Sequence, residues 1–416
     1  MSVISLPKNR INHITSNKFS ATAAKYKATT LLDNLDLPLL LSALTLLGIG
    51  LVMVASSSIS ISERQLSEPL YYFWRQFFYS IVGLIAAVIV FKIPLKYLQK
   101  SGPTLIVISL LLLVMVLIPG LGKEVNGSIR WLNLGVFSLQ VSEFVKLATV
   151  IYLAGYLVRH NQEVRTNLSG FLRPLGLIFI ISSLLIFEPD FGAVAVIAMT
   201  AMGMLWLGGA SFFQFIFLML TMAAVLSLVA ISSPYRMERL TTFLNPWADP
   251  FNSGFQLTQA LIAFGRGEWF GVGLGASVQK LFYLPEAHTD FVFAVLAEEL
   301  GLFSVMIVIL LFCFIVIRSL MIGRRAEKRE RPFTAFLAYG LGIWLGLQAF
   351  INIGVNMGVL PTKGLTLPLM SYGGSSLIIT CVVISMLLRA DYETRRFDRT
   401  GTSKISKKAS VGKRVW

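Results

Sequence analysis

Long runs of apolar residues alternate with short polar segments along most of this chain. A run of about 20 apolar residues is long enough to cross a bilayer as a helix. Ten runs approach this length and predict ten membrane-spanning helices, at residues 37–57, 74–91, 103–119, 141–158, 174–187, 191–208, 212–231, 291–317, 334–356 and 369–388. The pattern therefore predicts an all-α, polytopic integral membrane protein with one transmembrane domain over residues 37–390.

The composition agrees with this prediction. Of the 416 residues, 55% are hydrophobic and only 14% are charged, whereas a soluble domain carries about 25% charged residues. Both cysteines, Cys313 and Cys381, lie inside apolar runs. This placement favours small buried side chains over a disulfide or a metal site.

Basic residues are concentrated in alternate connecting segments. If the N-terminus lies inside the cell, the inner segments hold 26 of the 36 Lys and Arg residues. These segments are the tail 1–36, the loops 92–102, 159–173 and 318–332, and the tail 391–416 together with Arg389. Positively charged loops stay on the cytoplasmic side of a membrane. We therefore expect both termini to be cytoplasmic.

The net charge of +15 is then a signal of topology and an attraction to anionic membrane lipid. No folded soluble unit in the sequence interleaves aromatic and basic residues as nucleic-acid binding proteins do. We expect no nucleic-acid partner.

This orientation places a large outer loop, residues 232–290, between the seventh and eighth predicted helices. Glu286, His288 and Asp290 stand at its end, directly before the apolar run that begins at Phe291. A carboxylate beside apolar residues is partly desolvated, which raises its pKa toward that of a useful general base. Asp is also a favoured N-terminal helix cap. From the residues alone, Asp290 is either a base or a cap.

Several cationic residues lie on or near the outer side: Arg130, Lys146, Arg239, Lys280 and Lys363. Lys146 is unusual because it lies inside a predicted span, three residues after Glu143, so the two share a helix face. Ionisable residues at membrane depth often mark a functional path. Lys363 lies in a stiff outer loop between two prolines, and lysine is a suitable point charge for phosphate. For both lysines the alternative is a structural ion pair.

The outer loop carries two further patterns. Residues 254–265 repeat apolar side chains at helical spacing, which predicts a short helix that lies in the membrane interface or re-enters the membrane. The glycines at 265, 267, 271, 273 and 275 predict a tightly turning segment. Just beyond the loop, at least one of Glu298 and Glu299 must be buried, as a structural carboxylate or as part of an ion path.

Several long motifs make the chain resemble the SEDS family of membrane proteins, and its cell-division branch rather than its elongation branch. They are NGSIRW (126–131), QVSEFVKL (140–147), EPDFG (188–192), GFQ (254–256), LPEAHTD (284–290) and KGLTLPLMSYGGSS (363–376). NPW (245–247) and VQKLFYLPEA (278–287) favour the division branch. Val141 departs from the family's usual proline, at a helix start where proline is tolerated but not required.

The resemblance implies a peptidoglycan glycosyltransferase that polymerises lipid II at the outer face of the cytoplasmic membrane, at the division septum. It also implies that the protein acts together with a cognate class B penicillin-binding protein, which is a transpeptidase, and with other division membrane proteins. Asp290 matches the family's essential loop carboxylate. We expect it to serve as general base, or to orient the nucleophile, in an inverting transfer that releases undecaprenyl pyrophosphate.

Substrate contacts are expected from eight residues: Lys363, Lys146, Glu143, Arg130, Arg239, Lys280, Glu286 and His288. A divalent cation, magnesium or manganese, could help to stabilise the departing pyrophosphate, although no spacing in the sequence shows its ligands. Two other functions stay open. A lipid II flippase would suit the ionisable residues at membrane depth, although no paired broken helices indicate transporter repeats. A non-catalytic scaffold for the transpeptidase is the third possibility.

Overall fold

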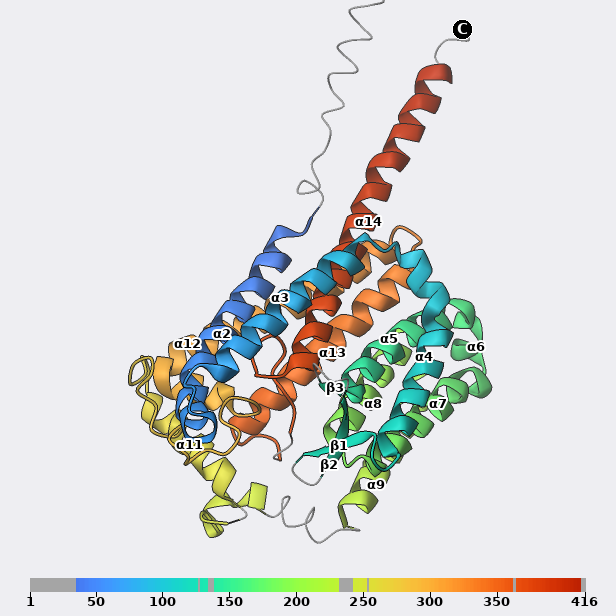
Figure 1. Ribbon diagram of the computed structural model, residues 1–416. Coiled ribbons are helices and arrows are strands. Elements are labelled where there is room, and N and C mark those ends of the chain that lie inside the picture. The colour runs from blue at the N-terminus through green and yellow to red at the C-terminus, as the bar shows by residue number, and fades with distance from the viewer. Residues whose placement is uncertain are drawn as a thin grey trace, which may run out of the picture.

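The computed structural model describes residues 35–125, 128–133, 138–231, 242–252, 254–361 and 364–412. They form a bundle of long helices with a small sheet and short helices at one end (Figure 1). The helices are α2 (Leu37–Leu66), α3 (Tyr71–Lys92), α4 (Leu95–Leu117), α5 (Val141–Arg159), α6 (Asn161–Thr166), α7 (Leu168–Phe187), α8 (Phe191–Leu207), α9 (Phe212–Ile231), α11 (Phe255–Gly267), α12 (Val292–Glu327), α13 (Pro332–Asn356) and α14 (Gly374–Gly412), with a 3₁₀ turn, η2, at Pro246–Ala248.

The described residues contain eight helices that are long and apolar enough to cross a membrane: α2, α3, α4, α5, α7, α12, α13 and α14. They coincide with eight of the predicted spans. The other two predicted spans, 191–208 and 212–231, coincide with α8 and α9, whose described apolar stretches are shorter. The chain is therefore a polytopic helical membrane protein, and the total of ten spans stays a prediction.

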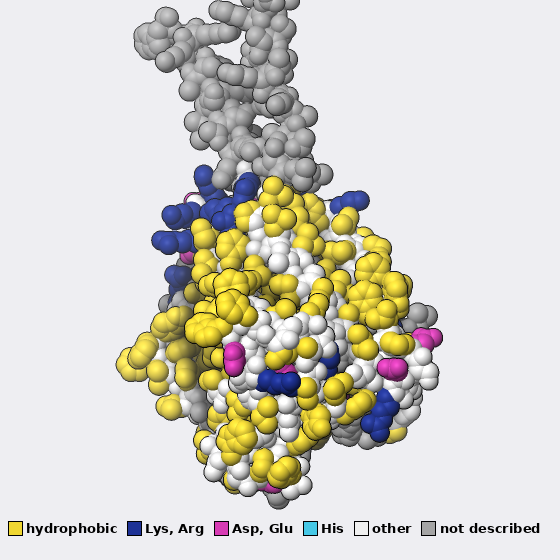
Figure 2. Space-filling model, turned by 90° about the vertical axis from the view of Figure 1, so that its left-hand side faces the viewer, with side chains coloured by type: hydrophobic (Ala, Val, Ile, Leu, Met, Phe, Trp, Pro, Cys, Tyr) yellow, Lys and Arg dark blue, Asp and Glu magenta, His cyan; other side chains and the backbone are white. Residues whose placement is uncertain are grey.

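Helix α2 begins and α14 leaves the bundle at the same end, the upper one in Figure 1; we call it the tail end. Lys and Arg side chains gather there above a largely hydrophobic surface (Figure 2). Buried acids pair with some of them, as in the 2.7 Å contact between Asp36 and Arg318. Helix α14 continues past residue 390, the predicted end of the transmembrane domain. The assignment of the tail end to the cytoplasm stays a prediction.

The opposite end, here called the loop end, carries the sheet. The all-α prediction missed this sheet, in which β1 (Gly122–Val125), β2 (Ser128–Asn133) and β3 (Ser138–Gln140) pair antiparallel in the order β1-β2-β3. Residue Leu132 faces Leu139 across the β2–β3 pair and is buried. The strands are only three to six residues long, too short to give a clear alternating pattern.

The described part of the outer loop lies against the beginning of α12. Helix α11 confirms the predicted short helix and packs on α12. Helix α12 is interrupted at Gly301, whose positive φ of 71° favours glycine. At this break the backbone amides of Val272 and Gly273 donate to the carbonyl oxygens of Glu298 and Glu299, at 3.0 Å each. The glycine-rich segment thus replaces part of the helix's own hydrogen bonding.

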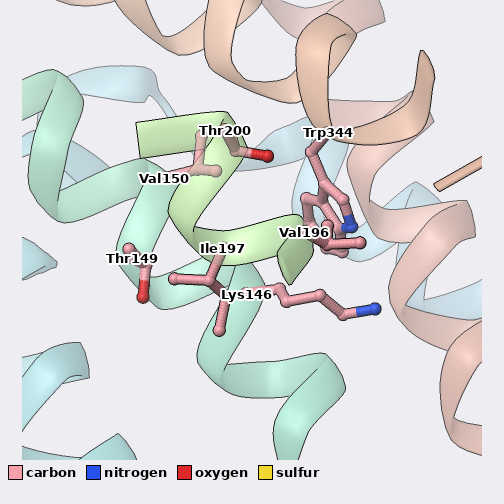
Figure 3. Close-up of a pocket in the computed structure, with 7 residues that line it drawn as sticks. All are labelled: Lys146, Thr149, Val150, Val196, Ile197, Thr200 and Trp344. Carbon is pink, nitrogen blue, oxygen red and sulfur yellow. The ribbon is translucent and has the colours of Figure 1, made fainter. Parts of the chain in front are cut away.

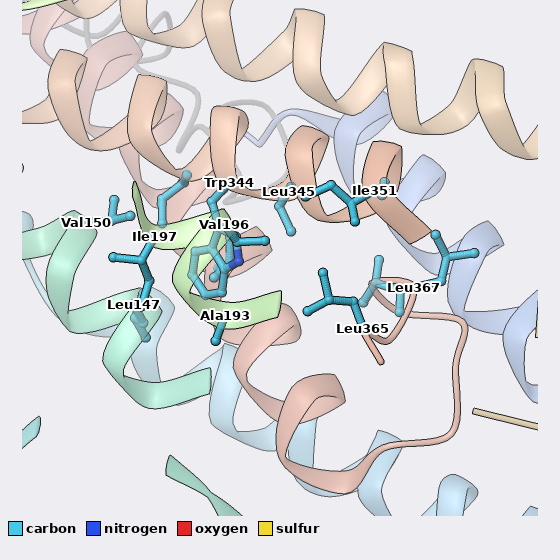
Figure 4. Packing of buried hydrophobic residues seen from close by; sticks show 14 of the residues in the cluster. Leu147, Val150, Ala193, Val196, Ile197, Trp344, Leu345, Ile351, Leu365 and Leu367 are labelled. Carbon is cyan, nitrogen blue, oxygen red and sulfur yellow. The ribbon is translucent and has the colours of Figure 1, made fainter. Parts of the chain in front are cut away.

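Helices α5, α8 and α13 form the centre of the bundle and position the site. The Trp344 indole of α13 lies beside Val196 of α8, and Ile197 of α8 and Val150 of α5 line the same small void (Figure 4). The loop that follows α13 returns to the same core through Leu365 and Leu367, both buried. This return brings the loop between α13 and α14 next to the start of α12.

Candidate active site

The segment 284–291 forms a compact turn at the loop end of α12. The Glu286 carbonyl oxygen accepts hydrogen bonds from the amides of Thr289 (3.1 Å) and Phe291 (3.2 Å). The Thr289 hydroxyl also donates to the Glu286 carboxylate at 2.7 Å. These bonds fix the backbone on both sides of Asp290, which is only partly buried.

The surroundings of Asp290 disfavour its ionised form. Burial, the negative charge of Glu286 and that of Asp190 raise the pKa of Asp290 to about 7, against the lowering effect of the Arg130 guanidinium. A carboxyl group with this pKa exchanges a proton near neutral pH, as a general base must. The expected raised pKa is therefore present at this residue.

Asp290 does not cap α12. The N-cap position is Phe291, and no side chain from that position caps the helix. Instead the Asn356 side-chain oxygen accepts the Ala294 amide at 3.1 Å, as an N-cap side chain would. The same amide also donates to the Phe291 carbonyl oxygen at 3.0 Å. Of the two roles that the sequence left open for Asp290, the cap is excluded.

Two asparagines on α13 hold the Asp290 backbone, and sequence analysis missed both. The Nδ2 groups of Asn352 and Asn356 each donate to the Asp290 carbonyl oxygen at 2.9 Å. The available signal was the spacing of Gln348, Asn352 and Asn356, four residues apart within an apolar span. Such spacing places three polar side chains on one helix face.

His288 lies in an aromatic contact rather than in open solvent. Its ring centroid is 4.7 Å from that of Tyr72 on α3 and 5.5 Å from that of Tyr372. The His288 carbonyl oxygen accepts the Tyr372 amide at 3.0 Å. Burial lowers the pKa of His288, opposed by the charge of Glu286, so the ring is neutral at pH 7. These contacts tie the turn to α3 and to the segment before α14.

Arg130 and the turn between α7 and α8 lie close enough to influence Asp290 electrostatically. Arg130, on β2, donates from Nε to the Glu188 carbonyl oxygen at 3.3 Å and from Nη2 to that of Pro189. Asp190 caps α8 by accepting the Ala193 amide at 3.2 Å. Arg130 therefore joins the sheet to the turn between α7 and α8.

The Glu188 carboxyl group is buried beside this connector. Neither of its oxygens has a hydrogen-bond partner among the described residues, and the same holds for Asp190 Oδ2. Burial and the charge of Asp190 raise the pKa of Glu188 to about 8 against the lowering effect of Arg130. Glu188 is therefore largely protonated at pH 7.

Glu143 and Lys146 form the ion pair that their spacing predicts, at 2.9 Å with both side chains buried. The Lys146 ammonium also donates to Gln348 Oε1 at 2.7 Å. Its aliphatic part lines a narrow void together with residues of α5 and α8 and with Trp344 (Figure 3), and this void is too small to admit a water molecule. Lys146 is connected to the site through Gln348, which donates to the Thr366 carbonyl oxygen at 3.0 Å.

Lys280 occupies a second buried network. Its ammonium donates to Glu299 (2.8 Å) and to the Ser56 hydroxyl of α2 (3.0 Å). Glu298 accepts from Arg266 (3.2 Å) and from the Val278 amide (3.1 Å). Both glutamates are fully buried, as expected for at least one of them, and their bonds hold the glycine-rich segment on α12.

Two predicted site residues, Arg239 and Lys363, lie outside the described residues. The loop that carries Lys363 nonetheless passes Asp290. A Cβ atom placed on Gly364 would lie 3.1 Å from Asp290 Oδ2. The structure therefore brings together Asp290, Glu286, His288, Arg130 and the residue next to Lys363, and places Lys146 and Lys280 in separate ion pairs.

A cation site does not emerge from the described side chains. No three of their His, Cys, Asp and Glu residues converge in a way that could hold a metal ion. A divalent cation at the site stays a prediction.

Comparisons with known proteins agree with these features. The sequence profile of the FtsW/RodA/SpoVE family, described as cell cycle proteins, matches residues 37–396. Probable peptidoglycan glycosyltransferase FtsW of Thioalkalivibrio sulfidiphilus is 58% identical over 88% of this chain and 91% of that protein. The protein of the same name from Nitrosococcus halophilus is 60% identical over 86% and 93%.

Solved structures give the same grouping. One chain of a peptidoglycan synthase complex superposes with a TM-score of 0.70 at 26% identity, over 86% of this chain and 98% of that one. The rod shape determining protein RodA of Thermus thermophilus superposes with a TM-score of 0.64 at 25% identity, over 86% and 96%. The much higher identity to the FtsW proteins confirms the predicted division branch. The chain belongs to the FtsW/RodA/SpoVE family of cell cycle proteins, the SEDS family, and groups with FtsW within it.

Proposed function

We propose that this protein is a peptidoglycan glycosyltransferase that polymerises lipid II into glycan strands at the outer face of the cytoplasmic membrane during septal cell-wall synthesis. Two curated relatives that cover most of the chain are named probable peptidoglycan glycosyltransferases. The observation that carries the proposal is the Asp290 carboxyl, which belongs to a partly exposed residue at the end of the outer loop, has a raised pKa of about 7 and makes no cap bond to α12. A base of this kind is what glycosyl transfer to a hydroxyl requires.

In the proposed reaction the 4-hydroxyl of the acceptor sugar attacks the anomeric carbon of the donor. Asp290 accepts the hydroxyl proton as the new glycosidic bond forms. The bond from the anomeric carbon to the pyrophosphate oxygen breaks, and undecaprenyl pyrophosphate leaves with both electrons. Direct displacement inverts the configuration and needs one base, so a second acid such as retaining glycosidases use is not required.

Positive charge near Asp290 is proposed to stabilise the departing pyrophosphate. Arg130 is the described candidate, since its charge acts on Asp290, and Lys363 is the candidate next to Gly364. Lys146 is assigned a different part. Its ammonium is held by Glu143 and Gln348, so we assign it to supporting the site rather than to binding the leaving group. Glu286 and His288 are proposed to shape the turn and to contact substrate.

The proposed partners are a class B penicillin-binding protein, other division membrane proteins and membrane lipid. A structural neighbour is a chain of a peptidoglycan synthase complex, which supports a transpeptidase partner. The proposed location is the cytoplasmic membrane at the division septum, with the loop end outside.

The test uses purified protein with its partner transpeptidase in liposomes that carry fluorescent lipid II in the outer leaflet only. Glycan polymer from this substrate supports the proposal. Translocation of lipid II to the inner leaflet without polymer would favour a flippase, and neither activity would favour a scaffold. Charge reversal at Lys363, with Lys123→Glu on β1 as the matched control, should lower turnover or lipid II affinity selectively; equal kinetics of the two variants would remove Lys363 from the site.

A further inference from the structure

Three carboxamide side chains lie four residues apart along α13, at Gln348, Asn352 and Asn356. All three are buried, with relative exposures of 1%, 2% and 0%. Polar groups in an apolar span carry a desolvation cost unless they are hydrogen-bonded. Each of the three is bonded to atoms outside α13, and the pattern of these bonds indicates a shared task.

Asn352 joins two segments that lie far apart in the sequence. Its Nδ2 donates to the Asp290 carbonyl oxygen at 2.9 Å and to the Leu365 carbonyl oxygen at 2.6 Å. An amide nitrogen has two hydrogens, so both are used. One side chain therefore fixes the distance between the turn that carries Asp290 and the loop that carries Gly364.

Asn356 lies one helical turn further along α13 and binds the same Asp290 turn. Its Nδ2 donates to the Asp290 carbonyl oxygen, and its Oδ1 accepts the Ala294 amide in the first turn of α12. Capping of a helix start is a task that Asp commonly performs. Because Asn356 performs it here, the Asp290 carboxylate is not drawn back onto the helix end.

Gln348 extends the row to the Glu143–Lys146 pair. It accepts from the Lys146 ammonium (2.7 Å) and from the Trp344 indole (2.9 Å), and it donates to the Thr366 carbonyl oxygen. The backbone at positions 365 and 366 is thus held at two consecutive carbonyl groups. Hydrogen bonds of Gln348 and Asn352 to the 365–366 backbone therefore connect the buried Glu143–Lys146 pair to the Asp290 turn.

We propose that Asn352 and Asn356 are positioning residues for glycosyl transfer, which hold the Asp290 turn and the 364–367 loop in one arrangement and leave the Asp290 carboxylate free to act on substrate. The inference rests on the proposed function of Asp290 as the base. Neither asparagine exchanges a proton with substrate in this account. Both act through the backbone of the residue that does.

The test compares Asn352→Ala and Asn356→Ala with Gln76→Ala as the matched control. Gln76 on α3 is a buried carboxamide that also holds two backbone groups of a loop, the Ser371 carbonyl oxygen at 3.0 Å and the Gly373 amide at 3.4 Å. It therefore matches the loss of buried hydrogen bonds. It reaches the Asp290 turn only indirectly, through the contacts of Tyr372 with His288, and makes no bond to the Asp290 backbone. Each variant is purified with the partner transpeptidase, and lipid II polymerisation is measured from pH 5.5 to 9.

A displacement of about 1 Å at a reacting group can cost about 100-fold in rate. We expect kcat to fall about 10- to 100-fold in the two asparagine variants, with KM for lipid II within about threefold of wild type. The midpoint of the pH–rate profile should move, because Asp290 changes its distance from Glu286 and Arg130. Gln76→Ala should lower the melting temperature to a similar extent and keep the wild-type midpoint.

Asparagine variants with the kcat and pH midpoint of Gln76→Ala would overturn the proposal. If Asn352→Ala does not fold, Asn352→Ser, which retains one donor, gives the same readout. If neither Asn352→Ala nor Asn352→Ser folds while Gln76→Ala does, Asn352 is required for folding, and this result would also overturn the proposal. Full activity of Asp290→Asn would instead refute the base itself, so the two failures can be told apart.

Discussion

The Asn356 side-chain oxygen accepts the backbone amide of Ala294 at 3.1 Å, in the first turn of α12. This bond supplies from α13 the helix cap that Asp290 would otherwise be placed to provide. The Asp290 carboxyl keeps its position at the end of the outer loop, where burial and nearby acids raise its pKa to about 7. The side-chain cap of this first turn is thus supplied by α13 and not by the Asp290 carboxyl.

The raised pKa of Asp290 predicts how stability depends on pH. A carboxyl whose folded pKa lies above its ordinary value contributes fully to stability below about pH 4, and the contribution is lost as pH rises through about 7. Asp290→Asn removes this ionisation. We expect the free energy of unfolding of the variant to exceed that of wild type by an amount that grows from pH 5 to pH 8, with an upper limit of about 4 kcal/mol, and the difference in melting temperature to grow with it.

Thermal unfolding in detergent across that pH range checks this prediction. Glu188 titrates in both proteins, so its contribution cancels in the difference. A difference that stays constant, or that shrinks as pH rises, would contradict the raised pKa.

Arg130 should set the pH at which the enzyme becomes active. Its charge lowers the pKa of Asp290, so Arg130→Ala should move the midpoint of the pH–rate profile upward. We expect activity at pH 7 to fall roughly three- to tenfold, with partial recovery at pH 9. Arg130→Lys should retain most of the wild-type profile, and Lys123→Ala on β1 is the control for loss of a neighbouring cation. An unchanged midpoint in Arg130→Ala would show that the Arg130 charge does not act on the ionisation of Asp290.

The Glu143–Lys146 pair should behave as a buried pair. Removing one partner leaves an uncompensated charge and costs about 3–5 kcal/mol, whereas removing both costs less. We expect Lys146→Met to lower the free energy of unfolding by this amount, and Glu143→Gln combined with Lys146→Met to recover part of the loss. The control pair, Glu163 and Arg173, is 2.8 Å apart but substantially exposed, so its removal should cost much less stability than breaking the buried pair.

Unfolding of the two single variants, the double variant and the control in detergent gives the comparison. Equal losses in the Lys146→Met and double variants would show that charge compensation is not what the pair provides.

Lys280 should prove structural. Its ammonium is occupied by Glu299 and Ser56, so Lys280→Met should destabilise the glycine-rich segment, and Lys280→Met with Glu299→Gln should restore part of the stability. Limited proteolysis within residues 268–283 measures the stability of the segment, and lipid II binding measures whether the substrate site is intact. A stable double variant that binds lipid II at least tenfold more weakly would return Lys280 to the substrate contacts that the sequence suggested.

Local patterns predicted the parts of the structure that depend on neighbours in sequence. Apolar runs located the helices, and the three-residue spacing of Glu143 and Lys146 predicted their ion pair, because residues on one helix face must meet. The position of Asp290 beside an apolar helix start predicted a raised pKa. These inferences needed no knowledge of which helices pack together.

The missed features depend on contacts between distant segments. Asn356 lies 62 residues from the amide that it caps, so no local pattern assigns it to α12. The interruption of α12 depends on a loop that supplies its own amides to Glu298 and Glu299. The burial of Lys280 likewise needs Ser56 of α2. In each case a polar group is satisfied by a partner that only the fold brings near.

The most direct test of the account is lipid II polymerisation by Asp290→Asn, purified with the partner transpeptidase. Asp249→Asn serves as the control, because it removes a carboxylate from the same outer loop at a position bonded to Asn252. The account predicts that Asp290→Asn binds lipid II but polymerises it at least about 100-fold more slowly at pH 7.5, while Asp249→Asn polymerises at close to the wild-type rate. Wild-type polymerisation by Asp290→Asn would contradict the assignment of Asp290 as the base.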